Sequence, residues 1–152
     1  MLYAGAGIAG YFLVLRPLLI KIGILSDPAR IATETRKTEQ IDNEIKAQTE
    51  SGVKPTKSVQ EWQTIADQIY QDLRYSALDD NKADAVYQAA RVKNDLDFWI
   101  LYKLFGKRRE YLFGIPSGGL MDLPQFIRSN VGIDKIAQLN WNYQNKGIKF
   151  RY

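Results

Sequence analysis

The chain has 152 residues, a net charge of +4 and a pI near 9.2, and it contains neither cysteine nor histidine. The lack of cysteine excludes disulfides, thiolate nucleophiles and cysteine-bound zinc, and the lack of histidine removes the commonest metal ligand and the side chain that titrates nearest neutral pH. We therefore expect a binding protein without a cofactor rather than an enzyme, and the mild positive charge favours an anionic lipid surface or an acidic partner over nucleic acid.

The N-terminal segment, residues 1–25, is almost entirely apolar or small, and residues 2–15 carry no charged side chain. A helix over residues 2–25 would be about 36 Å long, which is enough to cross a hydrocarbon core of about 30 Å. The segment therefore predicts a transmembrane helix over residues 1–25. The side chains expected to lie in the bilayer are those of Leu2, Tyr11, Phe12, Leu13, Val14, Leu15, Leu18, Leu19 and Ile20.

One charge interrupts this apolar run, at Arg16. A cation at the bilayer centre costs about 3 kcal/mol or more, so the depth of Arg16 matters. If the span covers residues 1–20, Arg16 lies about one turn from the boundary, and its long side chain is expected to snorkel to the headgroups beside Lys21. Pro17 would kink the helix there, which membrane helices tolerate when neighbouring groups satisfy the freed carbonyl.

The small residues at the start of the span spell G-A-G-I-A-G from Gly5 to Gly10, which also matches the glycine pattern of dinucleotide-binding folds. That fold requires a strand before the first glycine and a βαβ unit around it, and only four residues precede Gly5. We favour helix packing instead. Gly5 with Ala9, and Ala6 with Gly10, have the spacing that lets two membrane helices approach closely, which predicts a homo-oligomer through this helix.

Two other interpretations of the segment stay open, a cleaved signal peptide and a buried helix of a soluble protein. The first is disfavoured because no positive side chain precedes the apolar run. The second stays open because the strictly uncharged run is short, although a membrane span explains more of the segment. The positive-inside tendency gives the orientation: the N-terminus outside and residues 26–152 in the cytoplasm. The cations that follow the uncharged run are Arg16, Lys21, Arg30, Arg36 and Lys37.

Residues 26–57 are predicted to form a polar stalk helix followed by a linker. Asp27 and Pro28 are typical of a helix start, as cap and first position. The helix that follows has few sizeable apolar residues and cannot bury a broad face, so we expect it to be solvated or to be one arm of a multi-chain contact. Residues 51–58 contain the Gly, Pro and Ser of a linker.

Residues 58–152 are predicted to form a small bundle of about five helices without a sheet, which makes the whole chain all-α. A capping box at Ser58–Glu61 begins the first helix, Asp80 the second and Asn94–Asp95 the third, which Gly106 ends. Residues 110–119 are interpreted as a loop, and residues 120–131 and 133–147 as two short helices. The expected apolar faces comprise Trp62, Ile65, Ala66, Ile69, Tyr70, Leu73, Ala83, Val86, Tyr87, Ala90, Leu96, Trp99, Ile100, Leu104 and Phe105.

The densest group of carboxylates is Asp79, Asp80 and Asp84. It could hold a metal ion or form an acid–base pair, but capping and the helix dipole explain it better, and the same explanation serves Asp95 and Asp97. We therefore assign no metal-binding or catalytic residue.

Aromatic and basic residues alternate towards the end of the chain. Stacking on single-stranded nucleic acid is one interpretation; the favoured one is that the aromatic residues Tyr111, Phe113, Tyr143, Phe150 and Tyr152 are partly core. The cations near them, including Lys146, then face anionic lipid or an acidic partner. The residues predicted to form this surface are Lys107, Arg108, Arg109, Lys149 and Arg151. Residues 147–152 are expected either to add to a strand of a neighbour or to fray.

Residues 79–139 resemble an annexin-type helical repeat. The shared elements are an acidic helix start, a helix–turn–helix through Asn94–Asp95, an aromatic-rich helix ending in F-G-K-R, and a helix containing I-R at residues 127–128. Annexins bind calcium and anionic membranes through a G-x-G-T loop. That sequence does not occur here, so calcium binding is not carried over.

The layout of one N-terminal span, a polar stalk and a small basic domain resembles minor membrane proteins of icosahedral bacteriophages with an internal lipid vesicle. In such virions the cytoplasmic leaflet comes to face the capsid. We therefore expect a structural protein that links a lipid bilayer to capsid or other shell proteins. A bacterial inner-membrane scaffold or adaptor of an envelope complex is the alternative, and a carboxylate-based enzyme is the least favoured.

Overall fold

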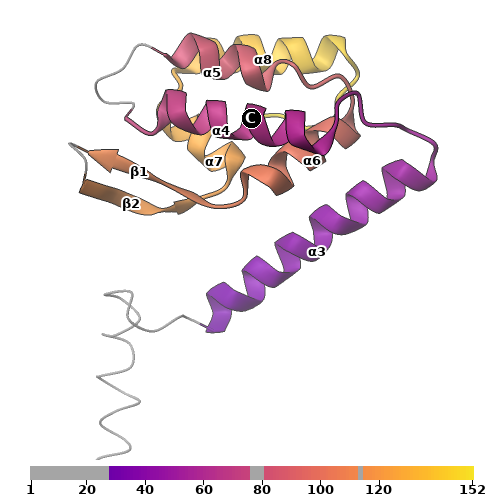
Figure 1. Ribbon diagram of the computed structural model, residues 1–152, viewed down its shortest axis with the longest axis horizontal. Helices are drawn as coiled ribbons and strands as arrows, with labels where there is room; N and C mark the ends of the chain where they lie inside the picture. The colour runs from indigo at the N-terminus through magenta and orange to yellow at the C-terminus, as the bar shows by residue number, and fades with distance from the viewer. Residues whose placement is uncertain (1–27, 76–80, 113–114) are drawn as a thin grey trace, which may run out of the picture. The chain divides into compact units, whose positions relative to one another are not determined.

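The computed structural model describes residues 28–75, 81–112 and 115–152, and the chain divides into two compact units, residues 1–40 and residues 41–152 (Figure 1). The predicted transmembrane helix over residues 1–25 lies outside the described residues. The same holds for every residue expected in it, including the packing residues and the two interfacial cations: Gly5, Ala6, Ala9, Gly10, Arg16 and Lys21. Among the helices that are described, none is both long and apolar enough to span a bilayer.

The helix predicted for the polar stretch is present as α3, Pro28–Glu50. No side chain between residues 32 and 50 is buried, as the scarcity of apolar residues predicts. Local polar contacts support it, including the Lys46–Glu50 ion pair at 3.8 Å one turn apart and the bond from Thr49 Oγ1 to the Ile45 carbonyl at 2.8 Å.

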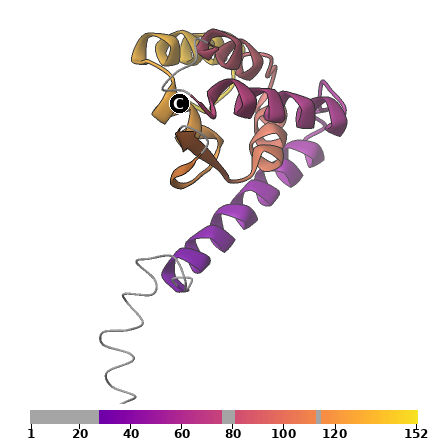
Figure 2. The same cartoon turned by 60° about the vertical axis from the view of Figure 1, so that its left-hand side comes forward.

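The second unit is mostly helical. Its helices within the described ranges are α4 (Val59–Leu73), α5 (Lys82–Ala89), α6 (Asp95–Phe105), α7 (Leu123–Asn130) and α8 (Ile133–Asn145), so the predicted helices are confirmed. The helix α4 is central, because it packs on α5, α6 and α7, and α5 also packs on α8. In both views α5 and α8 lie at one end of this unit (Figures 1 and 2).

The core forms on the predicted face of α4. Ser58 and Glu61 make the capping box, and the side chains of Trp62, Ile69 and Leu73 are fully buried at helical spacing. The helix α6 packs its buried Phe98, Leu101 and Phe105 on the same core and ends at Gly106, whose φ of +61° suits glycine.

The prediction of an all-α domain without a sheet is wrong at residues 110–119. Strands β1 (Arg108–Leu112) and β2 (Ile115–Met121) form an antiparallel hairpin in which Leu112 pairs with Ile115. The sequence does not predict the hairpin, because β1 is charged and β2 contains proline and two glycines, which are typical of turns. Contacts of the hairpin with helices, described below, supply what local propensity lacks.

The apolar face predicted for α5 is also wrong in part. The side chains of Ala85, Val86 and Ala89 are buried, whereas Ala83 and Tyr87 are exposed, Tyr87 by 65%. The predicted start at Asp80 lies outside the described residues, and the first described residue before the helix is Asn81. The helix is thus rotated relative to the prediction, which leaves an aromatic ring on the surface.

The last residues, 146–152, pack against the domain, so they neither fray nor extend as a free strand. Tyr152 donates its backbone N–H to Asn140 Oδ1 at 2.7 Å, and Asn140 Nδ2 donates to the Tyr152 carbonyl at 3.0 Å. Phe150 stacks on Phe98 with ring centroids 4.0 Å apart. Tyr143 is fully buried and its hydroxyl lies 3.3 Å from that of Tyr152. The interpretation as partly core is therefore confirmed for Tyr143, Phe150 and Tyr152, whereas Tyr111 is half-buried and Phe113 lies outside the described residues.

Candidate anion-binding pocket

A cavity of about 350 Å³ opens between the end of α5, α8 and the loop before α4. Its lining comprises Lys57, Tyr87, Ala90, Arg91, Lys93 and Asn142. Three of these six side chains are cationic and none is a carboxylate. Residues more than 80 positions apart in the sequence therefore meet around a positively charged hollow.

The loop side of the pocket is fixed by a buried carboxylate. Thr56 donates its backbone N–H and its hydroxyl to the two carboxylate oxygens of Asp97, at 2.8 and 2.7 Å. Asp97 also accepts the backbone N–H of Lys93 at 3.1 Å. These bonds hold the backbone on either side of the cavity, next to Lys57 and at Lys93 itself. The backbone that carries two of the lining cations is therefore fixed in place.

A fourth cation, Lys146, lies near Lys93 but is not part of the lining of the cavity. Its ammonium donates to the carbonyls of Ala90 and Val92, the second at 3.0 Å, just after the end of α5. Burial lowers the pKa of Lys146, and the charge of Lys93 lowers it further. The positive charges of Lys93 and Lys146 therefore repel each other, and an anion bound at Lys93 would reduce that repulsion.

The carboxylate of Glu61 lies near enough to Lys57 and Arg91 for their charges to act on it, but it is engaged with Ser58. It accepts the Ser58 backbone N–H at 2.9 Å and the Ser58 hydroxyl at 2.8 Å. Those two bonds lower the pKa of Glu61 most, and Lys57 and Arg91 lower it further. Glu61 therefore stays ionised but is directed to the helix cap.

The pocket can bind an oxyanion. An arginine guanidinium recognises carboxylate or phosphate with a planar fork, and lysine adds a compact charge. Arg91 is steadied by a bond of 2.9 Å from its Nη1 to Gln88 Oε1 on α5. Asn142 also lines the pocket, but its buried Oδ1, which has no hydrogen-bond partner within the described part of the chain, is an acceptor and cannot donate to an oxyanion. The exposed ring of Tyr87 borders the opening.

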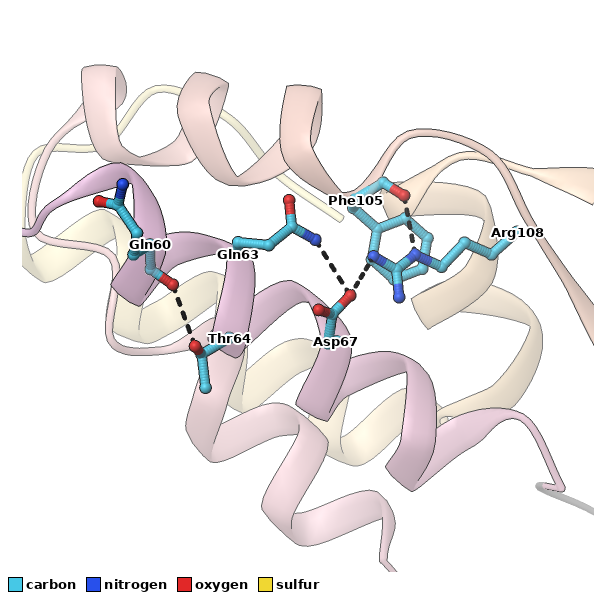
Figure 3. Close-up of polar contacts among 6 residues, drawn as sticks. All are labelled: Gln60, Gln63, Thr64, Asp67, Phe105 and Arg108. Atoms are coloured by element: carbon cyan, nitrogen blue, oxygen red, sulfur yellow. Dashed lines mark hydrogen bonds and ion pairs between the residues drawn. The ribbon is translucent and has the colours of Figure 1, made fainter.

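The residues predicted as a partner or lipid surface lie on two segments. Lys107 and Arg109 are exposed where the hairpin begins, but Arg108 turns inward and pairs with Asp67 (Figure 3). Lys149 is exposed on the final segment, and the guanidinium of Arg151 donates to the carbonyls of Ile148 and Phe150.

Sequence reasoning missed the pocket because Lys57 lies on a different segment from Arg91 and Lys93, and no sequence spacing relates it to them. The one available signal was the pair of cations at Arg91 and Lys93, directly after the end of a predicted helix. Only the packing of α5 on α8 and the anchored loop brings Lys57 to them.

The predicted capping carboxylates are only partly described. Asp84 lies in the first turn of α5, whereas Asp79 and Asp80 fall outside the described residues. Asn94 caps α6 by accepting the Asp97 N–H at 2.8 Å. Asp95 accepts the backbone N–H of Lys149 at 2.8 Å. In residues 28–75, 81–112 and 115–152, no three His, Cys, Asp or Glu side chains are grouped as a metal site requires.

Comparison with known proteins gave no match, whether to a family model, to a curated protein or to a solved structure.

Proposed function

We propose that this chain is a membrane-anchored structural protein whose helical domain binds an acidic segment of a protein shell, and so links a lipid bilayer to that shell. The observation that carries the proposal is the pocket itself: three lining cations without a lining carboxylate. A cleft of one sign attracts the opposite charge and gives a partner a fixed register.

The sequence supports the membrane side of the proposal. Residues 2–25 are apolar enough to span a bilayer, and α3 is a polar helix whose 23 residues extend about 35 Å. The setting we favour is a virion with an internal membrane, in which the domain faces the capsid and the N-terminus lies on the other side. A role as inner-membrane scaffold of a bacterial envelope complex uses the same chemistry. Recovery of the chain in purified particles, or in uninfected cells, separates the two.

The anchor is tested by washing membranes that contain the full chain with concentrated salt at neutral pH. We expect the chain to stay in the membrane pellet, because an apolar span is insensitive to ionic strength, whereas a chain held by its charges dissociates. Release into the supernatant would overturn the anchor.

The pocket is tested by titrating the full chain in detergent micelles with a labelled hexaglutamate peptide. We expect Arg91→Gln and Lys93→Gln each to weaken binding by about tenfold, since each removes a charge-assisted hydrogen bond. Arg36→Gln is the matched control: it removes one exposed cation of α3 outside the lining and should have little effect. Equal losses in all three variants would mean that net charge, not the pocket, attracts the peptide. Tighter binding of a single-stranded oligonucleotide would favour a nucleic-acid partner instead.

A further inference from the structure

The hairpin carries an apolar end that no part of the described chain covers. Leu112 and Ile115 form the last cross-strand pair, and their side chains are 44% and 68% exposed. Leu120 on β2 is 43% exposed. Three of the seven large apolar side chains exposed in the described residues therefore belong to this one hairpin. Clusters of that kind mark interaction sites more often than scattered apolar residues do.

The base of the hairpin is held firmly on the helices. Arg108 donates to Asp67 Oδ1 on α4 at 2.6 Å and to the Phe105 carbonyl at 2.9 Å (Figure 3). Its guanidinium also lies over the rings of Tyr70 and Phe105, 5.0 and 4.8 Å from their centroids. The Tyr70 hydroxyl donates to the Arg109 carbonyl at 3.1 Å.

Two further bonds continue this attachment along β1. The Tyr111 backbone N–H donates to the Arg74 carbonyl at 2.9 Å, and Asn130 Nδ2 on α7 donates to Glu110 Oε1 at 2.5 Å. Residues 108–111 are thus each tied to a helix or to the segment after one. The helices therefore support the base of the hairpin, whereas no bond of this kind to a described helix is made by Leu112 and Ile115 at its apolar end.

Charge divides along the same arm. Lys107 and Arg109 are exposed at the base, while the acidic Glu110 is directed to Asn130 on α7. Three residues of strand separate Arg109 from Leu112, a distance of about 10 Å. Interfacial segments bury their apolar residues about 5–10 Å below the headgroups, with cations at headgroup level, which matches this separation.

Addition of a partner strand fits β2 less well. Pro116 has no N–H to donate to a neighbouring strand, and Gly118 has a φ of +66°, which departs from extended backbone. Proteins use such features to block pairing at sheet edges. The apolar side chains of the tip therefore suit a fluid apolar medium better than a hydrogen-bonding partner.

We infer that the end of the β1–β2 hairpin at Leu112 and Ile115 inserts into the interface of an anionic bilayer. Leu120 and Arg109, which lie nearer the base of the hairpin, are then at the level of the lipid headgroups. The inference rests on the proposed function in one respect: the anchor keeps the domain at high effective concentration near the membrane. It adds a second contact on the hairpin, which lies away from α5 and α8 (Figures 1 and 2). The cationic pocket, by contrast, is lined by residues of α5, α8 and the loops next to them.

The experiment uses the absence of cysteine from the chain, which makes a single introduced cysteine a unique labelling site. The full chain with Leu112→Cys carries a nitrobenzoxadiazole label and is reconstituted into vesicles of phosphatidylcholine with about one third phosphatidylglycerol. We expect a blue-shifted emission that lipid-bound quenchers reduce. Adding Ile115→Asp should lower the inserted fraction about tenfold or more, because it puts a charge where the inserted state buries an aliphatic side chain in the bilayer.

A label at Ile133→Cys is the matched control, because Ile133 is 82% exposed but lies on α8. Quenching at residue 112 but not at 133 supports the inference, and a loss of the effect in vesicles without anionic lipid supports the role of Arg109. No quenching at 112 while the chain stays in the vesicle pellet would overturn the inference and leave the anchor intact. A blue shift that needs only a higher chain concentration, without vesicles, would assign the tip to a second copy and also overturn it.

Discussion

Asp67 and Arg108 form an ion pair across 41 residues of sequence, with Arg108 Nη2 lying 2.6 Å from Asp67 Oδ1. The Arg108 side chain is only 17% exposed and also donates to the Phe105 carbonyl (Figure 3). A charge that begins the hairpin thus holds it on α4, and this explains how a strand of sequence R-R-E-Y-L forms at all.

Replacing Arg108 by lysine should therefore loosen the hairpin although the charge is kept. Lysine cannot donate to the carboxylate and the carbonyl with a planar fork, and it stacks less well on Tyr70 and Phe105. We expect a loss of about 1–2 kcal/mol in the free energy of unfolding, measured by urea denaturation. Asp67→Asn should cost less, about 1 kcal/mol, because Asp67 is half exposed. Equal stability of Arg108→Lys and the parent chain would contradict the role of the fork.

Asp97 and Asp95 give a second prediction, since both lie in the first turn of α6 and share its dipole. Asp97 is fully buried and accepts three bonds, two from Thr56 and one from Lys93. Asp97→Ala leaves those donors unpaired and should cost about 3 kcal/mol in unfolding free energy. Asp95→Ala, which removes one bond from Lys149, should cost about 1 kcal/mol. Similar losses of stability in both variants would mean that Asp97 contributes only through the helix terminus, and not through its bonds to Thr56 and Lys93.

Helix existence could be predicted from the sequence wherever local signals agreed. The capping box at Ser58–Glu61, the cap at Asn94 and the stop at Gly106 all occur where the pattern places them, because each acts within one turn of backbone. The buried residues of α4 follow for the same reason: a 3.6-residue period is a local property.

What failed to follow from the sequence depends on contacts between distant segments. The hairpin is fixed by the contacts of Asp67 and Asn130, and the loop before α4 by those of Asp97. The partners lie far away in the sequence, and no regular spacing identifies them. The pocket has the same origin. Its cations could be counted in the sequence, but Lys57 reaches Arg91 only through tertiary packing.

The docked final segment yields a third prediction. Tyr152 packs edge-on against Phe98 and Tyr143, with ring centroids 6.3 and 5.6 Å away. Tyr152→Ala should cost about 3 kcal/mol in unfolding free energy, from lost burial and lost aromatic contacts. Lys149→Ala, an exposed neighbour in the same segment, should change it by less than about 0.5 kcal/mol. Thermal unfolding of the two variants measures the difference, and a small effect of Tyr152→Ala would mean that the segment is loosely held.

Alkaline pH should unfold the domain through its buried tyrosines. Burial raises the pKa of Tyr143 and Tyr152, and burial followed by the bond to Asp122 raises that of Tyr102. A raised pKa means that the folded state holds the phenol proton more tightly, so the stability it contributes is full below about pH 10 and falls as the pH rises further. Lys146 acts in the opposite sense, because burial lowers its pKa and folding becomes easier as it loses its proton.

Burial also raises the pKa of Tyr70, so four tyrosines lose stability as the pH rises above about 10 and one partly exposed lysine gains it, which gives a net loss. We expect the absorbance of tyrosinate and the loss of helical circular dichroism to rise together, and Tyr143→Phe to weaken that coupling while costing about 1 kcal/mol at neutral pH, through its lost bond to the Ala89 carbonyl. Ionisation of these tyrosines with the helices intact would contradict the prediction. The coupling also matters for testing the anchor: an alkaline wash unfolds the domain and probes residues 1–25 alone, whereas a salt wash at neutral pH leaves the pocket and the hairpin folded.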